Sequence, residues 1–239
     1  MSEGSMDRES NGRWLLRSAG ICGILYPLLD LSFFAIYPLA AGGPILSGAG
    51  QEAYIVRLAA LGERPWVLAL EWVHTLLPML LLPFALGLHG LLTARGQRSL
   101  AELALITFVL SLAITLPSNA MTATLNHDLG RSYVEATTVA ERTAIFAAFR
   151  GLGAWHGGLN KTASVLFQAF VGLSGLAMVL SGKYRVRGWI GVAGSVIALV
   201  KLTPGIPGMT NFLWTGLAYA VWPIAVGIGL LREPRPTEK

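Results

Sequence analysis

Six stretches of the chain are apolar and long enough to be read as membrane spans. A helix needs about 20 mostly apolar residues to cross a hydrocarbon core of about 30 Å. The stretches that approach or meet this requirement are 16–39, 66–92, 100–123, 158–181, 188–203 and 212–231. The fifth is short and is followed by the sequence PGIPG at 204–208, which cannot continue a helix. The pattern predicts an all-α fold, a polytopic transmembrane helical bundle of six spans.

The two longest loops between these spans, 40–65 and 124–157, have helical patterns of their own. In the first loop, apolar positions that share one helix face are Tyr54, Ile55, Leu58 and Leu61. Gly62 follows them as a candidate C-cap. In the second loop, Thr138 and Glu141 have the spacing of a capping box. We therefore predict one interfacial helix in each loop, which either seals the loop or acts as a lid.

Composition supports a membrane location, because charged residues are only 13% of the chain against about 25% in soluble domains. The net charge of +5 comes from basic residues near the predicted span ends and in the tails. One set of ends holds Arg8, Arg13, Arg17, Arg95, Arg98, Lys183, Arg185, Arg187, Arg232, Arg235 and Lys239. The opposite set holds Arg57, Arg64, Arg131, Arg142 and Arg150. By the positive-inside rule the first set is cytoplasmic, which excludes a nucleic-acid partner and makes membrane lipid the expected partner.

This orientation places both termini on the cytoplasmic side of the cell (inner) membrane. We predict a disordered cytoplasmic tail at 1–13, a membrane domain at 14–231 and a second cytoplasmic tail at 232–239. The first apolar stretch is too long for a signal-peptide core and contains Asp30, so we interpret it as an uncleaved span.

Small residues at helical spacing mark the places where spans can pack closely. The motifs are Ala19-x-x-x-Gly23, Gly172-x-x-Gly175 and Gly191-x-x-x-Ser195. Small side chains allow close backbone approach in lipid, where the hydrophobic effect does not draw helices together.

Two ionisable residues lie deep in the predicted spans, where a charge costs about 2.5–3.5 kcal/mol on insertion scales. Asp30 lies 13 residues after Arg17, or about 20 Å along a helix. Lys201 lies 13 residues after Gly188, at a similar depth in the fifth span. Their equal depth and opposite charge predict an Asp30–Lys201 ion pair.

Other polar residues gather in the outer half of the predicted bundle. Glu71 and His74 lie one turn apart in the second span, so they share a helix face. These residues either form compensating pairs that fix helix register, or they form the polar floor of a pocket for a small amphipathic or lipid-like molecule. In the second interpretation, Asp30 and Glu71 are the candidate catalytic acids. The candidate ligand-binding residues are His74, Asn119, Lys161, Gln168 and Lys201.

The sequence contains few motifs for other chemistry. Glu71-x-x-His74 has the spacing of a carboxylate-bridged metal site, and His127, Asp128 and His156 are expected near the same surface. A second Glu-x-x-His is missing, so we predict no metal site. No phosphate-binding loop and no nucleophile elbow occur, and we predict no cofactor.

Three stretches resemble a bacterial family of six-span membrane proteins known only as a domain of unknown function. They are 17–26 (RSAGICGILY), 85–92 (ALGLHGLL), and 172–178 (GLSGLAM) with its continuation through 183–194 (KYRVRGWIGVAG). The likeness covers most of spans one to five. It implies the six-span architecture and implies no activity.

The stretch 71–75 (EWVHT) resembles the acidic segment of membrane-bound terpene cyclases from fungal meroterpenoid pathways. In that family a glutamate there is thought to protonate an epoxide or alkene, which implies Glu71 as a general acid and an isoprenoid substrate. Aromatic residues that could stabilise a carbocation are Trp72, Trp214 and Trp222. The family has seven spans and a second acid in the last one, whereas 214–231 holds no carboxylate, so Asp30 would have to replace it.

Three functions follow from these observations. The first is ligand binding in the outer-half pocket. The second is isoprenoid or lipid chemistry with Glu71 or Asp30 as the acid. The third is a non-catalytic accessory subunit whose buried charges only fix its helices.

Overall fold

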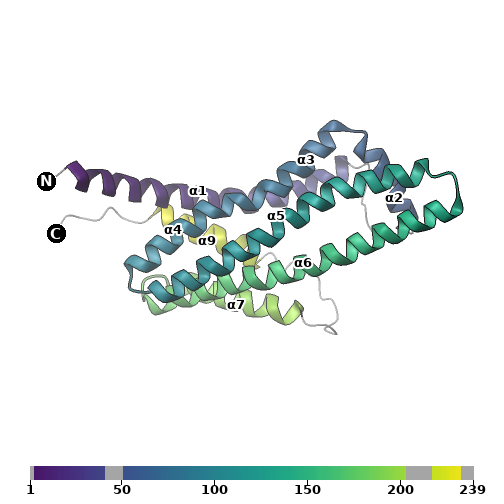
Figure 1. Ribbon diagram of the computed structural model, residues 1–239. Coiled ribbons are helices and arrows are strands. Elements are labelled where there is room, and N and C mark those ends of the chain that lie inside the picture. The colour runs from purple at the N-terminus through teal and green to yellow at the C-terminus, as the bar shows by residue number, and fades with distance from the viewer. Residues whose placement is uncertain (1–2, 41–50, 203–216, 233–239) are drawn as a thin grey trace. The chain divides into compact units, whose positions relative to one another are not determined.

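The computed structural model describes residues 3–40, 51–202 and 217–232, with the side chains of the first helix described from Trp14 onward. All regular structure in these ranges is helical (Figure 1). The α-helices are α1 (Glu3–Ala40), α2 (Gln51–Gly62), α3 (Pro65–Leu76), α4 (Leu81–Ala94), α5 (Arg98–Glu135), α6 (Val139–Leu180), α7 (Arg185–Leu202) and α9 (Trp222–Leu231). A 3₁₀ turn at Leu77–Leu80 joins α3 to α4, and a π-helical turn at Leu217–Val221 precedes α9. The predicted all-α bundle is therefore confirmed.

Four helical segments are long and apolar enough to cross a membrane: Trp14–Tyr37, Pro65–Ala94, Arg98–Glu135 and Val139–Leu180. They match the first four predicted spans in place. Of the last two, α7 has 18 residues, and Tyr219–Leu231 is a shorter apolar helix. The start of the predicted sixth span at 212 lies outside the described residues. Six spans therefore stay a prediction.

The predicted outer loop at 124–157 is wrong, because α5 and α6 continue through it. α5 has 38 residues and α6 has 42, which corresponds to about 57 Å and 63 Å of helix. Only residues 136–138 separate the two helices. A bilayer limits the length of the apolar stretch, but a helix continues beyond that stretch wherever its sequence contains no strong breaker. Glycines 151, 153, 157 and 158 do not interrupt α6.

The predicted capping box is confirmed as the start of α6. The Glu141 amide donates to Thr138 Oγ1 at 3.2 Å, and the Thr138 amide donates to Glu141 Oε2 at 3.0 Å. These reciprocal bonds satisfy backbone donors that the first helical turn leaves without partners. The motif therefore begins the longest helix of the chain and not a separate interfacial helix.

The helix predicted at the end of the first loop is present as α2, although the role of Gly62 differs from the prediction. Gly62 is the last helical residue and has no left-handed conformation, which among the described glycines occurs at Gly96 and Gly182. A Cβ atom at Gly62 would lie 3.0 Å from Cβ of His127. Gly62 is therefore needed for close packing and not for a left-handed C-cap. A position of α2 at a membrane interface stays a prediction.

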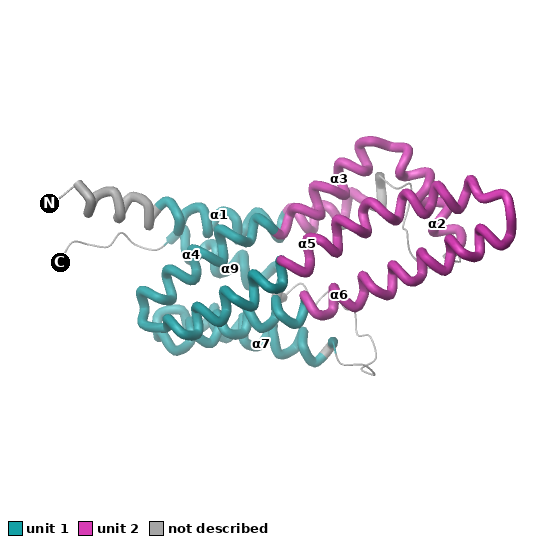
Figure 2. The backbone as a smooth tube through the Cα atoms, viewed as in Figure 1, with its two compact units in different colours: residues 1–28, 79–112, 164–239 teal, residues 29–78, 113–163 magenta. Residues whose placement is uncertain are grey.

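The chain forms two compact units (Figure 2). Unit 1 comprises Met1–Leu28, Met79–Leu112 and Ser164–Lys239, and unit 2 comprises Leu29–Pro78 and Ala113–Ala163. In unit 1 the fully buried Trp222 makes edge contacts with the rings of Phe84 and Phe170, at centroid distances of 5.7 and 5.9 Å. This aromatic cluster joins α4, α6 and α9 in the core of unit 1.

The small-residue motifs lie at the closest helix contacts of unit 1, as predicted. A Cβ at Gly175 of α6 would lie 2.7 Å from the Gly188 carbonyl oxygen of α7. A Cβ at Gly172 would lie 2.7 Å from Ser195 Oγ, between the same helices. A Cβ at Gly23 of α1 would meet the ring of Phe84 at 2.6 Å. Larger side chains at these positions would force the helices apart.

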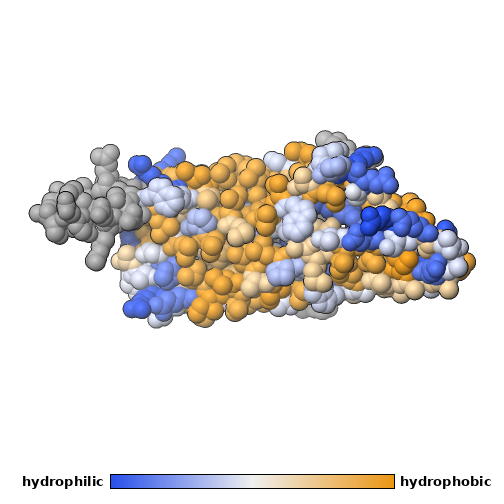
Figure 3. All heavy atoms as spheres, turned by 45° about the horizontal axis from the view of Figure 1, so that its top comes forward, coloured by the Kyte–Doolittle hydropathy of each residue, from blue (hydrophilic) through white to orange (hydrophobic). Residues whose placement is uncertain are grey.

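Apolar side chains also cover the outside of unit 1. On α5, four apolar side chains close together in sequence are each about half exposed: Leu103, Ile106, Val109 and Leu110. Only 22% of the most apolar part of α5 is buried inside the protein, so most of its apolar surface needs a non-aqueous surrounding. Figure 3 shows hydrophobic side chains gathered over the helices of unit 1, with hydrophilic side chains at the end where α5 and α7 begin.

Candidate functional site

The ionisable residues of α3 meet partners from two other helices of unit 2, α1 and α5. α3 begins at Pro65, whose fixed φ suits the first position of a helix. Glu71 and His74 lie three residues apart on it, and therefore on one face. Each makes a close contact with a side chain far away in sequence, Glu71 with His127 and His74 with Asp30. Unit 2 therefore contains two carboxylate–imidazole pairs about one helical turn apart.

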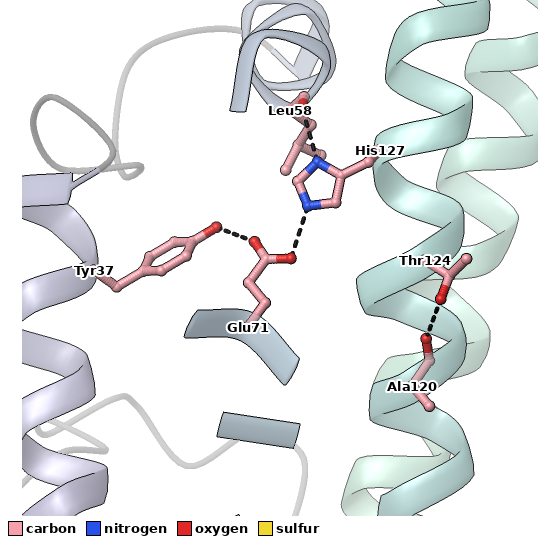
Figure 4. Close-up of polar contacts among 6 residues, drawn as sticks. All are labelled: Tyr37, Leu58, Glu71, Ala120, Thr124 and His127. Atoms are coloured by element: carbon pink, nitrogen blue, oxygen red, sulfur yellow. Dashed lines mark hydrogen bonds and ion pairs between the residues drawn. The ribbon is translucent and has the colours of Figure 1, made fainter. Parts of the chain in front are cut away.

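The Glu71–His127 pair, drawn with its partners in Figure 4, is almost closed to solvent. His127 Nε2 lies 2.7 Å from Glu71 Oε2, and the two side chains are 8% and 14% exposed. The Tyr37 hydroxyl of α1 donates to the other carboxylate oxygen, Oε1. His127 Nδ1 lies 2.8 Å from the backbone carbonyl of Leu58 in α2. Both oxygens of Glu71 and both nitrogens of His127 therefore have partners.

These partners determine where the protons lie. The Leu58 carbonyl can only accept, so Nδ1 of His127 must carry a hydrogen. The remaining proton is shared between Nε2 and Glu71 Oε2, which gives either an imidazolium–carboxylate pair or a neutral imidazole beside a neutral carboxyl group. The net charge of the pair is zero in both forms. A neutral pair with all its hydrogen bonds made is far less costly to bury than either charge alone.

Close packing of α2 on α5 holds His127 in this position. A Cβ at Gly130 of α5 would lie 2.9 Å from the Ile55 carbonyl oxygen and 2.8 Å from the Ala59 amide nitrogen. The absence of side chains at Gly62 and Gly130 therefore allows the Leu58 carbonyl to reach the imidazole. α2 also brings Tyr54 near the site, where burial, followed by the negative charge of Glu71, raises the pKa of its hydroxyl.

The second pair, Asp30 and His74, is more open. Asp30 Oδ1 lies 3.1 Å from His74 Nε2, and the two side chains are 24% and 28% exposed. The Phe33 ring stacks on the imidazole of His74 at a centroid distance of 3.9 Å, and on the Tyr37 ring at 5.0 Å. Asp30, Phe33 and Tyr37 are spaced i, i+3, i+7 along α1, so one face of α1 supplies all three. A carboxylate and an imidazole beside stacked rings can exchange a proton or hydrogen-bond a polar head group.

A third polar cluster of unit 2 surrounds His156 of α6. Its Nδ1 lies 2.9 Å from Ser118 Oγ and 2.9 Å from Thr122 Oγ1, both on α5. The side-chain amide nitrogen of Asn160, Nδ2, donates to Nε2 of His156 at 2.7 Å. Thr122 donates its own hydroxyl hydrogen to the Ser118 carbonyl, so its oxygen accepts from the imidazole. These contacts fit a neutral His156 with its proton on Nδ1, which joins α5 to α6.

The structure brings Asp30 and His74 into contact and places Glu71 one helical turn away on α3. The other predicted residues of unit 2 are less directly involved. Trp72 is 44% exposed, Lys161 is exposed and Asn119 is half-buried. Gln168 is buried within unit 1.

The predicted Asp30–Lys201 ion pair stays a prediction, because the side chain of Lys201 lies outside the described residues. Trp214 lies outside them as well. The partner that the structure gives Asp30 is His74. Within the described residues, no three His, Cys, Asp or Glu side chains are grouped as metal ligands would be.

Sequence reasoning missed the partners of Glu71. Tyr37 lies seven residues after Asp30 and shares its helix face, so the spacing along α1 could have identified it. His127 was considered only as a metal ligand, because it falls where a loop was predicted. Its contact with Glu71 bridges 56 residues and depends on the packing of α2 on α5, which no local pattern reveals.

In comparisons with known proteins, no family model, no curated protein and no solved structure matches the chain. The chemistry of the site therefore has to be argued from its own residues. Fold-level analogy adds nothing to that argument.

Proposed function

We propose that this chain is an integral membrane protein whose Asp30–His74 pair binds the polar head of a small amphipathic or lipid-like molecule. The observation that carries the proposal is the difference in exposure between the two carboxylate–imidazole pairs. Glu71 and His127 use their polar atoms on protein partners and are nearly closed to solvent. About a quarter of each side chain in the Asp30–His74 pair stays exposed.

The cost of polar groups in a membrane supports this assignment. An ionisable side chain within a span is expensive, and such residues usually face a partner or a water-filled or ligand-binding cavity. A pair that served only to fix α1 against α3 would be most stable fully enclosed, as Glu71–His127 is. The open Asp30–His74 pair presents a hydrogen-bond acceptor beside an imidazole, which suits a hydroxyl, amine or similar head group.

Apolar groups next to the pair suit the rest of an amphipathic molecule. Phe33 covers the imidazole of His74. The same ring also stacks on Tyr37. A ligand with its head at Asp30 could therefore place its apolar part along these rings. From the positive-inside rule we place this site in the outer half of the membrane, with both termini on the cytoplasmic side.

Native mass spectrometry tests the proposal. Wild-type protein and Asp30→Asn would be purified from their own membrane in mild detergent, with Asp128→Asn as a control that removes an exposed carboxylate of unit 2. We expect a discrete copurifying mass in the wild type and in the control, and its loss from Asp30→Asn. The same ordinary phospholipids in all three samples would contradict the proposal.

A catalytic function at the same place is a second candidate, favoured by the stacked rings beside the Asp30–His74 pair. Protonation of an isoprenoid epoxide or alkene by a carboxyl group would produce a carbocation, which aromatic faces stabilise. Asp30 suits the role of acid better than Glu71, whose two oxygens both have partners. The cyclised carbocation would then lose a proton to the site and give a neutral product, so substrate and product have equal mass.

Incubation with an isoprenoid epoxide distinguishes this candidate from simple binding. Cyclisation initiated by the enzyme's acid would give an isomer of the substrate in which the epoxide oxygen has become a hydroxyl group and a new carbon–carbon bond closes a ring. Asp30→Asn should abolish the product, while Asp128→Asn should not. Binding of the epoxide without any product would leave the binding function and remove the catalytic one.

A further inference from the structure

A basic cluster lies in unit 1, outside the site described above. It consists of Arg95, Lys183 and Arg187, all placed around the ring of Tyr184. The distance to the ring centroid is 5.5 Å from the guanidinium carbon of Arg95, 5.6 Å from Nζ of Lys183 and 5.7 Å from the guanidinium carbon of Arg187. Tyr184 itself is only 7% exposed, so its ring forms a nearly buried base on which three cations converge.

Two tight turns build the cluster. Arg95 follows α4 and is succeeded by Gly96 at φ +77°, and Lys183 follows Gly182 at φ +79° in the turn between α6 and α7. These left-handed conformations suit glycine and reverse the chain within a few residues. The turns bring cations from α4 and from the α6–α7 connection to the same ring.

Arg187 also packs against α9. A side chain at Gly229 would collide with the Arg187 guanidinium, so this glycine provides the space that the guanidinium occupies. A planar group that packs near an aromatic ring and against a helix backbone loses little further freedom on binding a ligand. Such preorganisation distinguishes Arg187 from a solvated surface arginine.

The local charge is strongly positive. Residues 95–100 and 181–188 contain five basic residues, Arg95, Arg98, Lys183, Arg185 and Arg187, and no acidic residue. The next acid along the chain, Glu102, accepts a 2.7 Å bond from Arg98. The N-terminus of α7 adds the positive end of a helix dipole, while the C-termini of α4 and α6, close to Arg95 and Lys183 in the chain, contribute negative ends.

We propose that the basic cluster binds the phosphate of an anionic phospholipid head group. Arginine donates paired hydrogen bonds that match phosphate oxygens, and lysine adds a point charge. The cluster lies at the ends of apolar helices, where head groups meet a membrane protein. Trp189, one turn into α7 and 58% exposed, is the residue type enriched at that depth.

The test compares lipid binding by native mass spectrometry, with phosphatidylglycerol and phosphatidylcholine of identical chains titrated against the purified protein. Wild type should favour phosphatidylglycerol by about tenfold or more, equivalent to about 1.4 kcal/mol. Arg187→Gln and Lys183→Gln should each reduce this preference several-fold. Arg185→Gln is the matched control: it removes the same charge from the same turn but not from the ring cluster, and it should preserve the preference.

Tyr184→Leu tests the arrangement without changing the charge. It retains every cation but removes the ring on which they converge, so we expect a several-fold loss of preference for phosphatidylglycerol in protein whose melting temperature shows that it is folded. An equal loss in Arg185→Gln and Arg187→Gln would show only diffuse attraction and would overturn the proposal. Displacement of phosphatidylglycerol by millimolar inorganic phosphate would support a phosphate site. Binding of inorganic phosphate without any preference for phosphatidylglycerol would assign the cluster to a soluble anion and overturn the lipid proposal.

Discussion

The helices of the two units are held together by different means. In unit 1, backbones approach closely at small residues, as at Gly175 and Gly188, and aromatic rings fill the space around Trp222. In unit 2, side-chain hydrogen bonds connect the helices, as in Glu71–His127 and Ser118–His156. Both are solutions to the same difficulty, because hydrophobic burial provides little force between helices in lipid.

Buried polar atoms show the same division. Among the described residues, the buried side-chain nitrogen and oxygen atoms that lack a hydrogen-bond partner all lie in unit 1. They are Thr93 Oγ1, Gln168 Oε1, Ser174 Oγ and Trp222 Nε1. In unit 2 the buried Ser118 and His127 have partners. Unit 1 thus buries several polar atoms without partners, although Ser195 donates to the Val192 carbonyl of its own helix, whereas in unit 2 polar side chains bond across helices. The concentration of ionisable residues in the networks of unit 2 directs the search for function to that unit.

The largest effect is expected from separating the closed pair of unit 2. His127→Leu would leave Glu71 buried without its charged partner, and we expect the free energy of unfolding in detergent to fall by about 3 kcal/mol. Asp128→Asn, the exposed neighbouring residue, should change it little. The double variant Glu71→Leu/His127→Leu should recover much of the loss. A loss below about 1 kcal/mol in His127→Leu would show that unit 2 does not depend on this network.

The next effect belongs to unit 1 and comes from steric overlap. A Cβ at Gly188 would lie 2.5 Å from the Gly175 carbonyl oxygen and 2.9 Å from the Val179 amide nitrogen, so Gly188→Ala should force α6 and α7 apart. We expect it to lower the free energy of unfolding by about 2 kcal/mol.

Gly90→Ala is the matched control in the same unit. A Cβ there meets nothing within 4 Å, and alanine favours helix over glycine by up to about 1 kcal/mol. The control should therefore be neutral or stabilising when both variants are measured by chemical unfolding in the same detergent. A harmless Gly188→Ala would remove close packing as the explanation for unit 1.

The parts of the fold that the sequence predicted are those determined by local pattern. Apolar length identified the first four spans, and the small-residue motifs identified close contacts such as Gly172 with Ser195. The boundaries of α5 and α6 were wrong because hydropathy reports where lipid lies and not where a helix ends. The 3₁₀ turn within the second span lies at Pro78, which lacks the amide hydrogen needed for a regular helix.

Only half of the candidate site was predictable for the same reason. Asp30, Glu71 and His74 were identified because ionisable residues are conspicuous in apolar segments. Their partners were not, since the Glu71–His127 and Asp30–His74 contacts depend on which helices lie side by side. Charge and depth suggested Lys201 for Asp30, and that pairing stays a prediction because the Lys201 side chain lies outside the described residues; neither property pointed to His74.

The smallest expected effect gives the most direct comparison between the units, since it uses the same substitution in each. Ser118 in unit 2 is fully buried, and its hydroxyl lies 2.9 Å from His156 Nδ1. Ser118→Ala removes one of the two hydroxyls facing that nitrogen, so we expect the free energy of unfolding to fall by about 1 kcal/mol.

Ser174 in unit 1 is 1% exposed, and its hydroxyl is without a partner. Ser174→Ala removes a buried polar group that makes no hydrogen bond, so it should leave the protein equally stable or stabilise it by up to about 1 kcal/mol. Volume change and helix propensity are the same in both variants, and therefore the sign of the difference between them reports the hydrogen bond alone. Equal losses at both positions would mean that the Ser174 hydroxyl is paired as well, and this contrast between the units would disappear.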